Sequence, residues 1–275
     1  MPFARHTLNL QFICRLKPNK NKKTVIQKAA NKHYDMNLTV DIGNTRTKIA
    51  VFNGEQFVCE EKFEEAAPQH LLDMVALYSP DKLAYCSVGS GQPAFETALQ
   101  KLSCPVLHVT GETPAPVTVH YRTPHTLGAD RLAAVVGAIT LQPETDLLVI
   151  DAGTCITYDL VDAAGNYLGG NISPGVEMRL EALHTRTARL PRTEADGETP
   201  DLGYDTETAI RAGVVRGIGY ELQGCIRHWQ KRYPTLRIFL TGGNRYAFSN
   251  AVRQNILTDS HLVARGLNHL LEMLP

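Results

Sequence analysis

Two stretches of the chain share one order of apolar and polar positions. Residues 38–52 consist of an apolar strand, a short polar turn of small residues and a second apolar strand, and residues 148–161 repeat that order. When Asp41 is aligned with Asp151, 151 − 41 = 110 positions later, a glycine and a threonine also coincide. A repeat at this spacing predicts a duplicated architecture in which each half carries one such hairpin.

The same patterning predicts the rest of the first half. Asn53-Gly54 is a pair that favours a tight hairpin turn, so we expect a third strand after the first two. Further on, apolar residues at helical spacing alternate with short apolar runs bounded by Pro and Gly. The chain therefore predicts three strands within 37–63, a helix at 67–78, a strand at 82–88, a helix at 93–102 and a strand at 105–110.

The second half continues in a similar way after its hairpin. It predicts a turn at 162–165, a strand at 167–172, a helix from 176 towards 189, a polar loop at 191–203, a helix at 208–233, a strand at 236–240 and a terminal helix at 261–274. Glycine weakens a helix by about 1 kcal/mol relative to alanine. We expect the glycines of the long helix to allow close approach of another helix, in the same chain or across a dimer interface: Gly213, Gly217, Gly219 and Gly224.

Composition indicates an ordinary globular protein with an atypical beginning. A chain of 275 residues is long enough for two domains, and no apolar run approaches the roughly 20 residues that span a bilayer. The net charge is zero, but residues 1–35 hold 8 of the 28 basic residues and one acid, which leaves 20 basic and 27 acidic residues elsewhere. Such an arm can bind nucleic acid or a membrane. Because it lacks helical periodicity, we expect a disordered extension instead, with neither partner.

The cysteines and histidines suggest no metal centre. None of the six cysteines forms a Cys-x-x-Cys pair, and most lie within apolar segments. Reduced cysteines of this kind are typical of a reducing compartment, so we expect a cytoplasmic protein.

The first hairpin has the composition of a phosphate-binding turn. A carboxylate at the end of a strand can face a metal ion, and exposed N–H groups and hydroxyls after it can hold phosphate oxygens. An ordinary β-turn with a structural aspartate is the alternative. The candidate residues are Asp41, Ile42, Gly43, Asn44, Thr45, Arg46, Thr47 and Lys48.

A second candidate for chemistry lies between the halves. In Gly128-Ala129-Asp130-Arg131 the last two residues fall in the first turn of a predicted helix, at its partially positive end. Asp130 is a candidate base for an acceptor hydroxyl, and Arg131 a forked donor to a substrate carboxylate. The alternative is an ordinary first-turn pair.

Together the motifs resemble one family. The two hairpins resemble those of the actin/Hsp70/sugar-kinase superfamily. Asp41-x-Gly43-Asn44-Thr45, residues 128–131, Asp151-x-Gly153-Thr154 and residues 169–175 in this order resemble the type III pantothenate kinases, from about Met36 to the C-terminus. The resemblance implies an α/β fold of two duplicated ribonuclease-H-like domains, 36–127 and 128–275, with a nucleotide cleft between them.

The resemblance also implies roles for residues. It implies ATP-dependent phosphorylation of pantothenate to 4'-phosphopantothenate, the first step of coenzyme A synthesis, by a homodimer. Residues 41–48 and Thr154 would contact ATP, with Asp41 near Mg²⁺ through water, and Asp151 would bind K⁺ or ammonium. Asp130 would accept the proton, and residues 241–244 would lie against adenosine. The pantothenate site would comprise Tyr121, Gly128, Ala129, Asp130, Arg131 and, from the partner subunit, Thr206.

Two other classes of function remain open at this point. One is another small-molecule kinase or phosphatase of the superfamily, acting on a sugar, acetate or polyphosphate; the short Gly-Ala-Asp-Arg motif argues against it. The other is a non-enzymatic ATP-dependent regulator, against which the carboxylate at Asp130 argues.

Overall fold

The computed structural model describes residues 35–64, 67–88, 93–243 and 255–274. The chain forms two compact units. The first contains residues up to 116, residues 122–140 and the residues from 261 onward; the second contains residues 117–121 and 141–260. A domain boundary between residues 127 and 128 remains a prediction.

Within the described residues, no helix has both the length and the apolar character needed to cross a bilayer. The predicted extension at 1–34 lies outside the described residues.

The first unit is built on a five-stranded sheet. Its strand order is β3-β2-β1-β4-β5, in which β1, β2 and β3 are antiparallel and β4 and β5 run parallel to β1. The order three strands, helix, strand, helix, strand is confirmed, as expected for a ribonuclease-H-like unit. The strands are β1 (Met36–Ile42), β2 (Thr47–Asn53), β3 (Gln56–Phe63), β4 (Lys82–Ser87) and β5 (Val106–His108).

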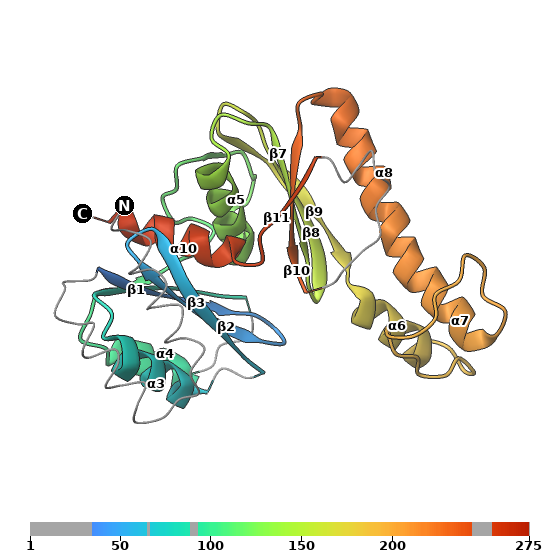
Figure 1. The fold of residues 1–275 in the computed structure, drawn as a ribbon, viewed down its shortest axis with the longest axis horizontal. Helices are drawn as coiled ribbons and strands as arrows, with labels where there is room; N and C mark the ends of the chain where they lie inside the picture. The colour runs from blue at the N-terminus through green and yellow to red at the C-terminus, as the bar shows by residue number, and fades with distance from the viewer. Residues whose placement is uncertain (1–34, 65–66, 89–92, 244–254, 275) are drawn as a thin grey trace, which may run out of the picture. The chain divides into compact units, whose positions relative to one another are not determined.

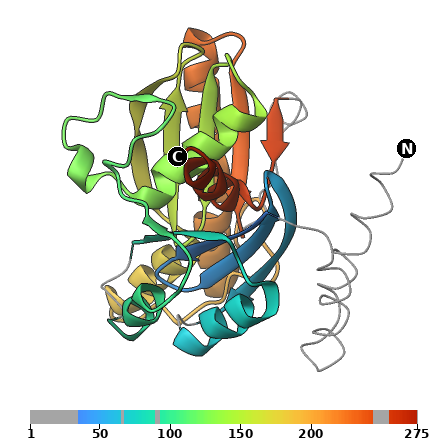
Figure 2. The same ribbon diagram turned by 90° about the vertical axis from the view of Figure 1, so that its left-hand side faces the viewer.

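Helices cover both faces of this sheet. Figures 1 and 2 show α3 (Pro68–Tyr78) and α4 (Pro93–Gln100) on one face and α10 (Leu262–Glu272) on the other. The helix α3 ends as predicted: Ser79 adopts a φ of 47°, and its N–H donates to the Val75 carbonyl. Leu71 and Phe95 lie in the apolar core between these helices and the sheet.

The helix α10 crosses α5 (Ala129–Leu141) at two glycines. A Cβ atom on Gly266 would collide with the Ala133 carbonyl oxygen, and one on Gly137 with the Leu262 carbonyl oxygen. The two backbones therefore touch where neither residue carries a side chain.

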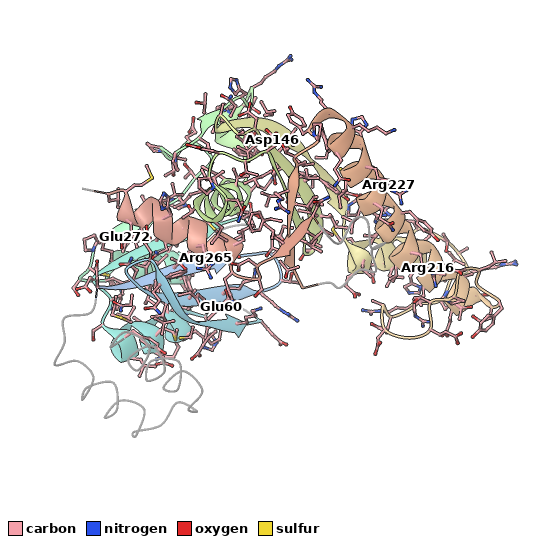
Figure 3. All side chains as sticks on the ribbon, turned by 45° about the horizontal axis from the view of Figure 1, so that its top comes forward. Glu60, Asp146, Arg216, Arg227, Arg265 and Glu272 are labelled. Atoms are coloured by element: carbon pink, nitrogen blue, oxygen red, sulfur yellow. The ribbon has the colours of Figure 1, made fainter. Side chains whose placement is uncertain are left out.

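Polar contacts also tie α10 to the sheet. The buried Asn37 side chain on β1 donates to Asn268 at 2.8 Å and to Glu272, and Glu272 pairs with Lys82 at 3.3 Å. Figure 3 labels Glu272 on α10. A buried amide is costly without partners, and α10 supplies both acceptors of the Asn37 side-chain nitrogen.

The second unit repeats the first. Its order is β11-β10-β7-β8-β9-β6, and from β9 to β11 the pairing pattern is that of β3-β2-β1-β4-β5. The short edge strands β6 and β11 were not predicted. The strands are β6 (Thr118–Val119), β7 (Leu147–Ala152), β8 (Cys155–Val161), β9 (Asn166–Pro174), β10 (Arg237–Gly242) and β11 (Ile256–Thr258), and a 3₁₀ turn covers Pro124–Thr126.

Helices of the second unit differ from the prediction at two places. The helix α6 (Val176–Thr185) ends before residue 189, because the chain turns back so that Leu190 reaches the apolar core. The predicted helix at 208–233 consists of α7 (Thr206–Arg211), a π-helical turn (Ala212–Arg216) and α8 (Gly217–Arg232).

The glycines of this helical stretch do not serve contacts inside the chain. No described atom lies within 4 Å of a Cβ built on Gly213, Gly217, Gly219 or Gly224. The prediction that these glycines allow close approach of another helix of the same chain is therefore wrong for the described residues. A contact across a dimer interface stays a prediction.

Candidate active site

The first hairpin holds Asp41 between two side chains. Asp41 lies at the end of β1 and pairs in register with Lys48 on β2 and Cys86 on β4. The Lys48 ammonium lies 3.2 Å from Asp41 Oδ2, and the Cys86 thiol donates to Oδ1 at 3.7 Å. Each carboxylate oxygen therefore has a fixed neighbour, which orients the carboxylate.

The turn of this hairpin divides the predicted phosphate-binding residues into two groups. The Gly43 N–H donates to the Arg46 carbonyl at 3.0 Å and closes the turn. The side chains of residues 44–46 are exposed, whereas Ile42 and Thr47 are buried. The side chains of residues 44–46 are therefore open to a ligand, whereas those of Ile42 and Thr47 are covered.

The second carboxylate lies at the start of α5. The first helical hydrogen bond runs from the Leu132 N–H to the Gly128 carbonyl, and Asp130 Oδ1 accepts from the Arg131 N–H at 2.9 Å. A Cβ on Gly128 would lie 2.5 Å from that oxygen, so glycine leaves the room that the carboxylate occupies. Ala129 and Arg131 are buried.

Cys86 connects the two carboxylates. Burial raises the pKa of the Cys86 thiol, and the negative charges of Asp41 and Asp130 raise it further. Asp41 contacts this sulfur directly, and the charge of Asp130, in the same unit, also acts on it. Sequence reasoning missed Cys86, because its place beside Asp41 depends on the register of β4 against β1.

The second hairpin has the same backbone and different neighbours. Asp151 pairs in register with Thr157 on β8 and Thr241 on β10. The Thr154 carbonyl accepts from the Gly175 N–H at 3.0 Å, and a Cβ on Gly175 would lie 2.5 Å from it. The last glycine of the 169–175 motif therefore packs directly against the turn that carries Thr154.

A polar network fixes the strand end before Gly175. Arg179 donates to the Pro174 carbonyl and to Ser173 Oγ, each at 2.7 Å, and pairs with Glu221 at 2.5 Å. Glu221 also accepts from the Tyr158 hydroxyl at 2.7 Å. The pKa of Tyr158 is raised, mainly by burial and then by this hydrogen bond. The pKa of Glu221 is lowered: its own burial would raise the pKa, but the hydrogen bonds from Tyr158 and Arg179 outweigh that effect.

The remaining predicted residues lie in the second unit. The Tyr121 ring lies 6.4 Å from that of Tyr167. Thr206 is the exposed first residue of α7, directly after the capping residue Asp205.

The glycine pair at 242–243 has a structural role at its first position. Gly242 has a φ of 97°, and a Cβ there would collide with the Ala152 backbone, whereas Gly243 faces open space. Close approach of β7 explains the first glycine without a ligand. Asn244, the last residue of the predicted adenosine contact, lies outside the described residues.

Comparisons with known proteins agree with the motifs. A sequence profile of the family described as Type III pantothenate kinase matches residues 37–228. A type III pantothenate kinase of Phocaeicola vulgatus is 47% identical over 240 residues, which cover 86% of this chain and 98% of the relative. One of Bacteroides fragilis is 48% identical over 237 residues, covering 86% and 97%.

Solved structures share the fold. A Baf family protein from Campylobacter jejuni has a TM-score of 0.54 at 20% identity and covers 85% of this chain and 96% of its own. An activator of 2-hydroxyisocaproyl-CoA dehydratase from Clostridium difficile, solved with bound ADPNP, has a TM-score of 0.50 at 12% identity and covers 87% and 94%. At these identities the likeness extends to the fold alone, which is the predicted one of two ribonuclease-H-like units.

Proposed function

This chain belongs to the type III pantothenate kinase family, and we propose that the residues described above carry out the ATP-dependent phosphorylation of pantothenate to 4'-phosphopantothenate, the first step of coenzyme A synthesis. The observation that supports this assignment is that the first unit contains two oriented carboxylates: Asp41, which Lys48 and Cys86 contact, and Asp130, whose Oδ1 accepts from the Arg131 N–H. Phosphoryl transfer requires mainly positioning and charge stabilisation, and this neighbourhood offers fixed carboxylates for both.

ATP and a divalent metal ion are the cofactors that a kinase of this family uses. Among the described residues, no group of three or more His, Cys, Asp and Glu side chains could hold a metal by itself. Mg²⁺ is usually held by one or two carboxylates together with phosphates and water, and Asp41 fits that pattern. We assign the exposed turn 44–46 and Lys48 to the phosphates, with Ile42, Gly43 and Thr47 contributing backbone, and Thr154 to a further nucleotide contact.

Asp130 is proposed to accept the proton of the pantothenate hydroxyl. Its Oδ1 accepts from the Arg131 N–H at 2.9 Å, which fixes the orientation of the carboxylate at the start of α5. Because the transition state of phosphoryl transfer is loose, orientation of the hydroxyl is the larger part of this role. Arg131 would bind the substrate carboxylate, with Tyr121, Gly128 and Ala129 lining the site. Since Arg131 is only 5% exposed, a carboxylate bound to it would be largely desolvated.

Asp151 is proposed to bind a monovalent cation, K⁺ or ammonium. Its register neighbours Thr157 and Thr241 are hydroxyl residues, so the strands bring oxygen atoms to one face of the sheet. Hard cations prefer such oxygen ligands.

The cytoplasmic location of the protein, which the cysteines suggested, remains a prediction.

A homodimer is proposed in which Thr206 completes the partner's pantothenate site. Thr206 is exposed, and large apolar side chains of the second unit between residues 172 and 220 are exposed as well. Exposed apolar surface of this kind is typical of protein interfaces. The most exposed are Ile172 at 62%, Leu202 at 86%, Tyr204 at 68% and Tyr220 at 63%.

The decisive experiment for the reaction is a panel assay. The purified protein is incubated with ATP, Mg²⁺ and K⁺ and, separately, pantothenate, a hexose, acetate or polyphosphate, and products are identified by mass spectrometry. We expect 4'-phosphopantothenate alone. If another acceptor is phosphorylated and pantothenate is not, the assignment of pantothenate as the substrate is wrong. Nucleotide binding without any phosphorylated product would favour the alternative of a non-enzymatic ATP-dependent regulator.

Co-expression tests the shared site. Asp130→Asn and Thr206→Arg chains, each inactive alone, should regain activity together, because a mixed dimer contains one intact pocket. With random pairing half of the dimers are mixed, so recovery is limited to about a quarter of wild-type pockets. An active monomer by light scattering, or no recovery, contradicts the proposal.

A further inference from the structure

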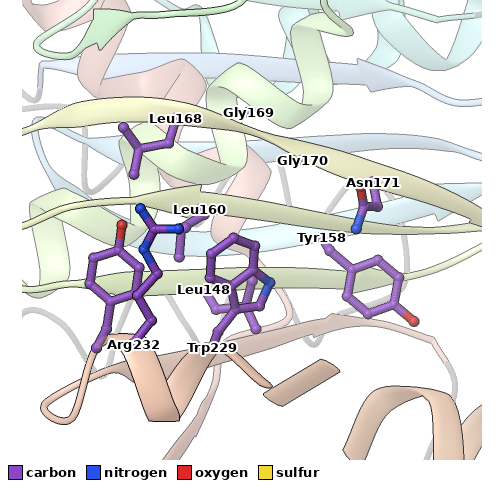
Figure 4. Close-up of a pocket in the computed structure, with 10 residues that line it drawn as sticks. Leu148, Tyr158, Leu160, Leu168, Gly169, Gly170, Asn171, Trp229 and Arg232 are labelled. Atoms are coloured by element: carbon purple, nitrogen blue, oxygen red, sulfur yellow. The ribbon is translucent and has the colours of Figure 1, made fainter. Parts of the chain in front are cut away.

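A cavity of about 310 Å³ opens in the second unit beside the end of α8. Its lining comes from β7, β8, β9 and the last turn of α8 together with Tyr233, as Figure 4 shows. None of these residues has been given a part in the proposed reaction. The volume lies at the lower end of the range typical of small-ligand sites, about 300–1,000 Å³.

The floor and walls of the cavity are apolar and aromatic. Leu148 and Leu160 are buried on the sheet, and Leu168 is 40% exposed. The rings of Trp229 and Tyr233 lie 6.1 Å apart at 40°. Trp229 also contacts the His228 ring edge-on, with the ring centroids 5.2 Å apart, so the cavity is bounded by an aromatic surface. Such a lining suits a flat or branched apolar body.

The charge at the cavity is positive. Arg232 lines it, with its guanidinium carbon 6.0 Å from the Tyr233 ring centroid, and no carboxylate among the described residues forms an ion pair with it. Glu221, which the lining residue Tyr158 contacts, is already paired with Arg179. The cation beside the apolar lining is therefore available to a ligand anion, and a guanidinium fork matches a carboxylate or sulfonate in geometry.

We propose that this cavity is a second small-molecule site, which takes an organic anion with an aromatic or branched apolar body seated between the leucine floor and Trp229, and with its anionic group on Arg232. The proposal does not depend on pantothenate phosphorylation, because the occupant needs neither the hydroxyl and amide groups of pantothenate nor the triphosphate of ATP.

The sole tryptophan of the chain makes the site directly observable. Since Trp229 is the only tryptophan, a change in tryptophan emission reports on this cavity. The probe is 2-naphthoate, titrated into the full chain in the presence of saturating ATP, Mg²⁺ and pantothenate, with calorimetry in parallel. We expect one molecule per chain, saturable quenching of Trp229, and about fivefold weaker binding of the neutral 2-naphthamide, because exposed charge pairs contribute modestly.

Three variants locate the probe. Arg232→Gln should abolish the preference for the anion, and Leu168→Glu should weaken naphthoate binding at least as much by placing a carboxylate at the exposed rim. Arg227→Gln, an exposed cation on α8 outside the lining, is the matched control and should change nothing. Figure 3 labels its position. No binding at millimolar probe, binding without Trp229 quenching, or equal effects of Arg232→Gln and Arg227→Gln would overturn the proposal, whatever the outcome of the kinase assay.

Discussion

The two hairpins have the same strand pairing and place an aspartate at the same position, yet they surround it with different chemistry. Asp41 lies between Lys48 and Cys86, whereas the register neighbours of Asp151 are Thr157 and Thr241. The first carboxylate is held by an ammonium and a neutral thiol that act on separate oxygens. The second has hydroxyl residues on both flanks.

This difference shows that a duplicated turn does not imply a duplicated role. Cross-strand neighbours decide which ion a carboxylate can serve, because they supply either a competing positive charge or additional oxygen ligands. In our proposal the first hairpin accordingly serves the nucleotide phosphates, whereas Asp151 of the second serves the monovalent cation and Thr154 adds a nucleotide contact. Each prediction below changes one side of this comparison.

The largest effect is expected at the chemical step in the first unit. Asp130→Asn should lower kcat by about 10²–10⁴, the usual contribution of a positioned base, while ATP binding by calorimetry stays unchanged. Asp73→Asn is the control, because this exposed carboxylate on α3 accepts a hydrogen bond from Gln69 within the same helix. Activity within a few-fold of wild type would remove Asp130 from the reaction.

The next largest effect is expected when the proposed monovalent-cation site at Asp151 is removed while the first hairpin is left intact. Asp151→Ala should lower activity by about 10–100-fold, the usual cost of disturbing a metal environment, and should remove the difference between K⁺ and Na⁺ buffers. Lys48→Gln, which disturbs the first hairpin instead, should raise the KM for ATP and keep the preference for K⁺. Equal rates of the wild type in Na⁺ and K⁺ would contradict the assignment of Asp151.

A smaller effect should follow from loosening the support of the second hairpin. Arg179→Gln removes donors to Pro174 and Ser173, next to the Gly175 contact with Thr154. We expect the KM for ATP to rise about three- to tenfold with kcat nearly unchanged, since net hydrogen bonds to charged groups contribute about 1.5–3 kcal/mol and partial exposure screens them. Arg179→Lys should restore part of the loss, and Glu177→Gln on the exposed face of α6 should have no effect. A purely structural role predicts a lower melting temperature and no change in KM.

The smallest effect concerns Cys86 and pH. Because the pKa of this thiol is raised by burial and by Asp41 and Asp130, it stays protonated at neutral pH and should react far more slowly with iodoacetamide than a denatured control. The folded state retains a proton that the unfolded chain loses above about pH 8.5, so this group stabilises the fold at lower pH and the stabilisation falls as pH rises. Cys86→Ser should flatten that fall in chemical denaturation. An unchanged pH profile would contradict the raised pKa.

Local sequence signals predicted most helices and the strands other than β6 and β11. The apolar runs and the Asp–Gly–hydroxyl order identified both hairpins, and Asn53-Gly54 identified the turn before β3, because these features depend on neighbours in the chain. The predicted end of α6 was wrong, because Leu190 packs against the apolar core and the helix ends before it.

Features that depend on distant residues could not be predicted. Cys86 lies beside Asp41 only through the register of β4, and Gly137 and Gly266 matter only because α5 and α10 cross. By contrast, the glycines from 213 to 224 attracted a packing interpretation that the described chain does not support. A glycine in a helix therefore indicates close contact only once its neighbours are known.

The contact of α10 with the first strand has a consequence for biosynthesis. The side-chain nitrogen of Asn37 on β1 donates to Asn268 and Glu272, more than two hundred positions later in the chain. At about 5–20 residues per second, the ribosome takes roughly 10 to 45 s to reach α10 after β1 has been made. During that interval the face of the first sheet that α10 covers is open on the nascent chain. The unit that contains β1 is thus completed only after the second unit has been synthesised.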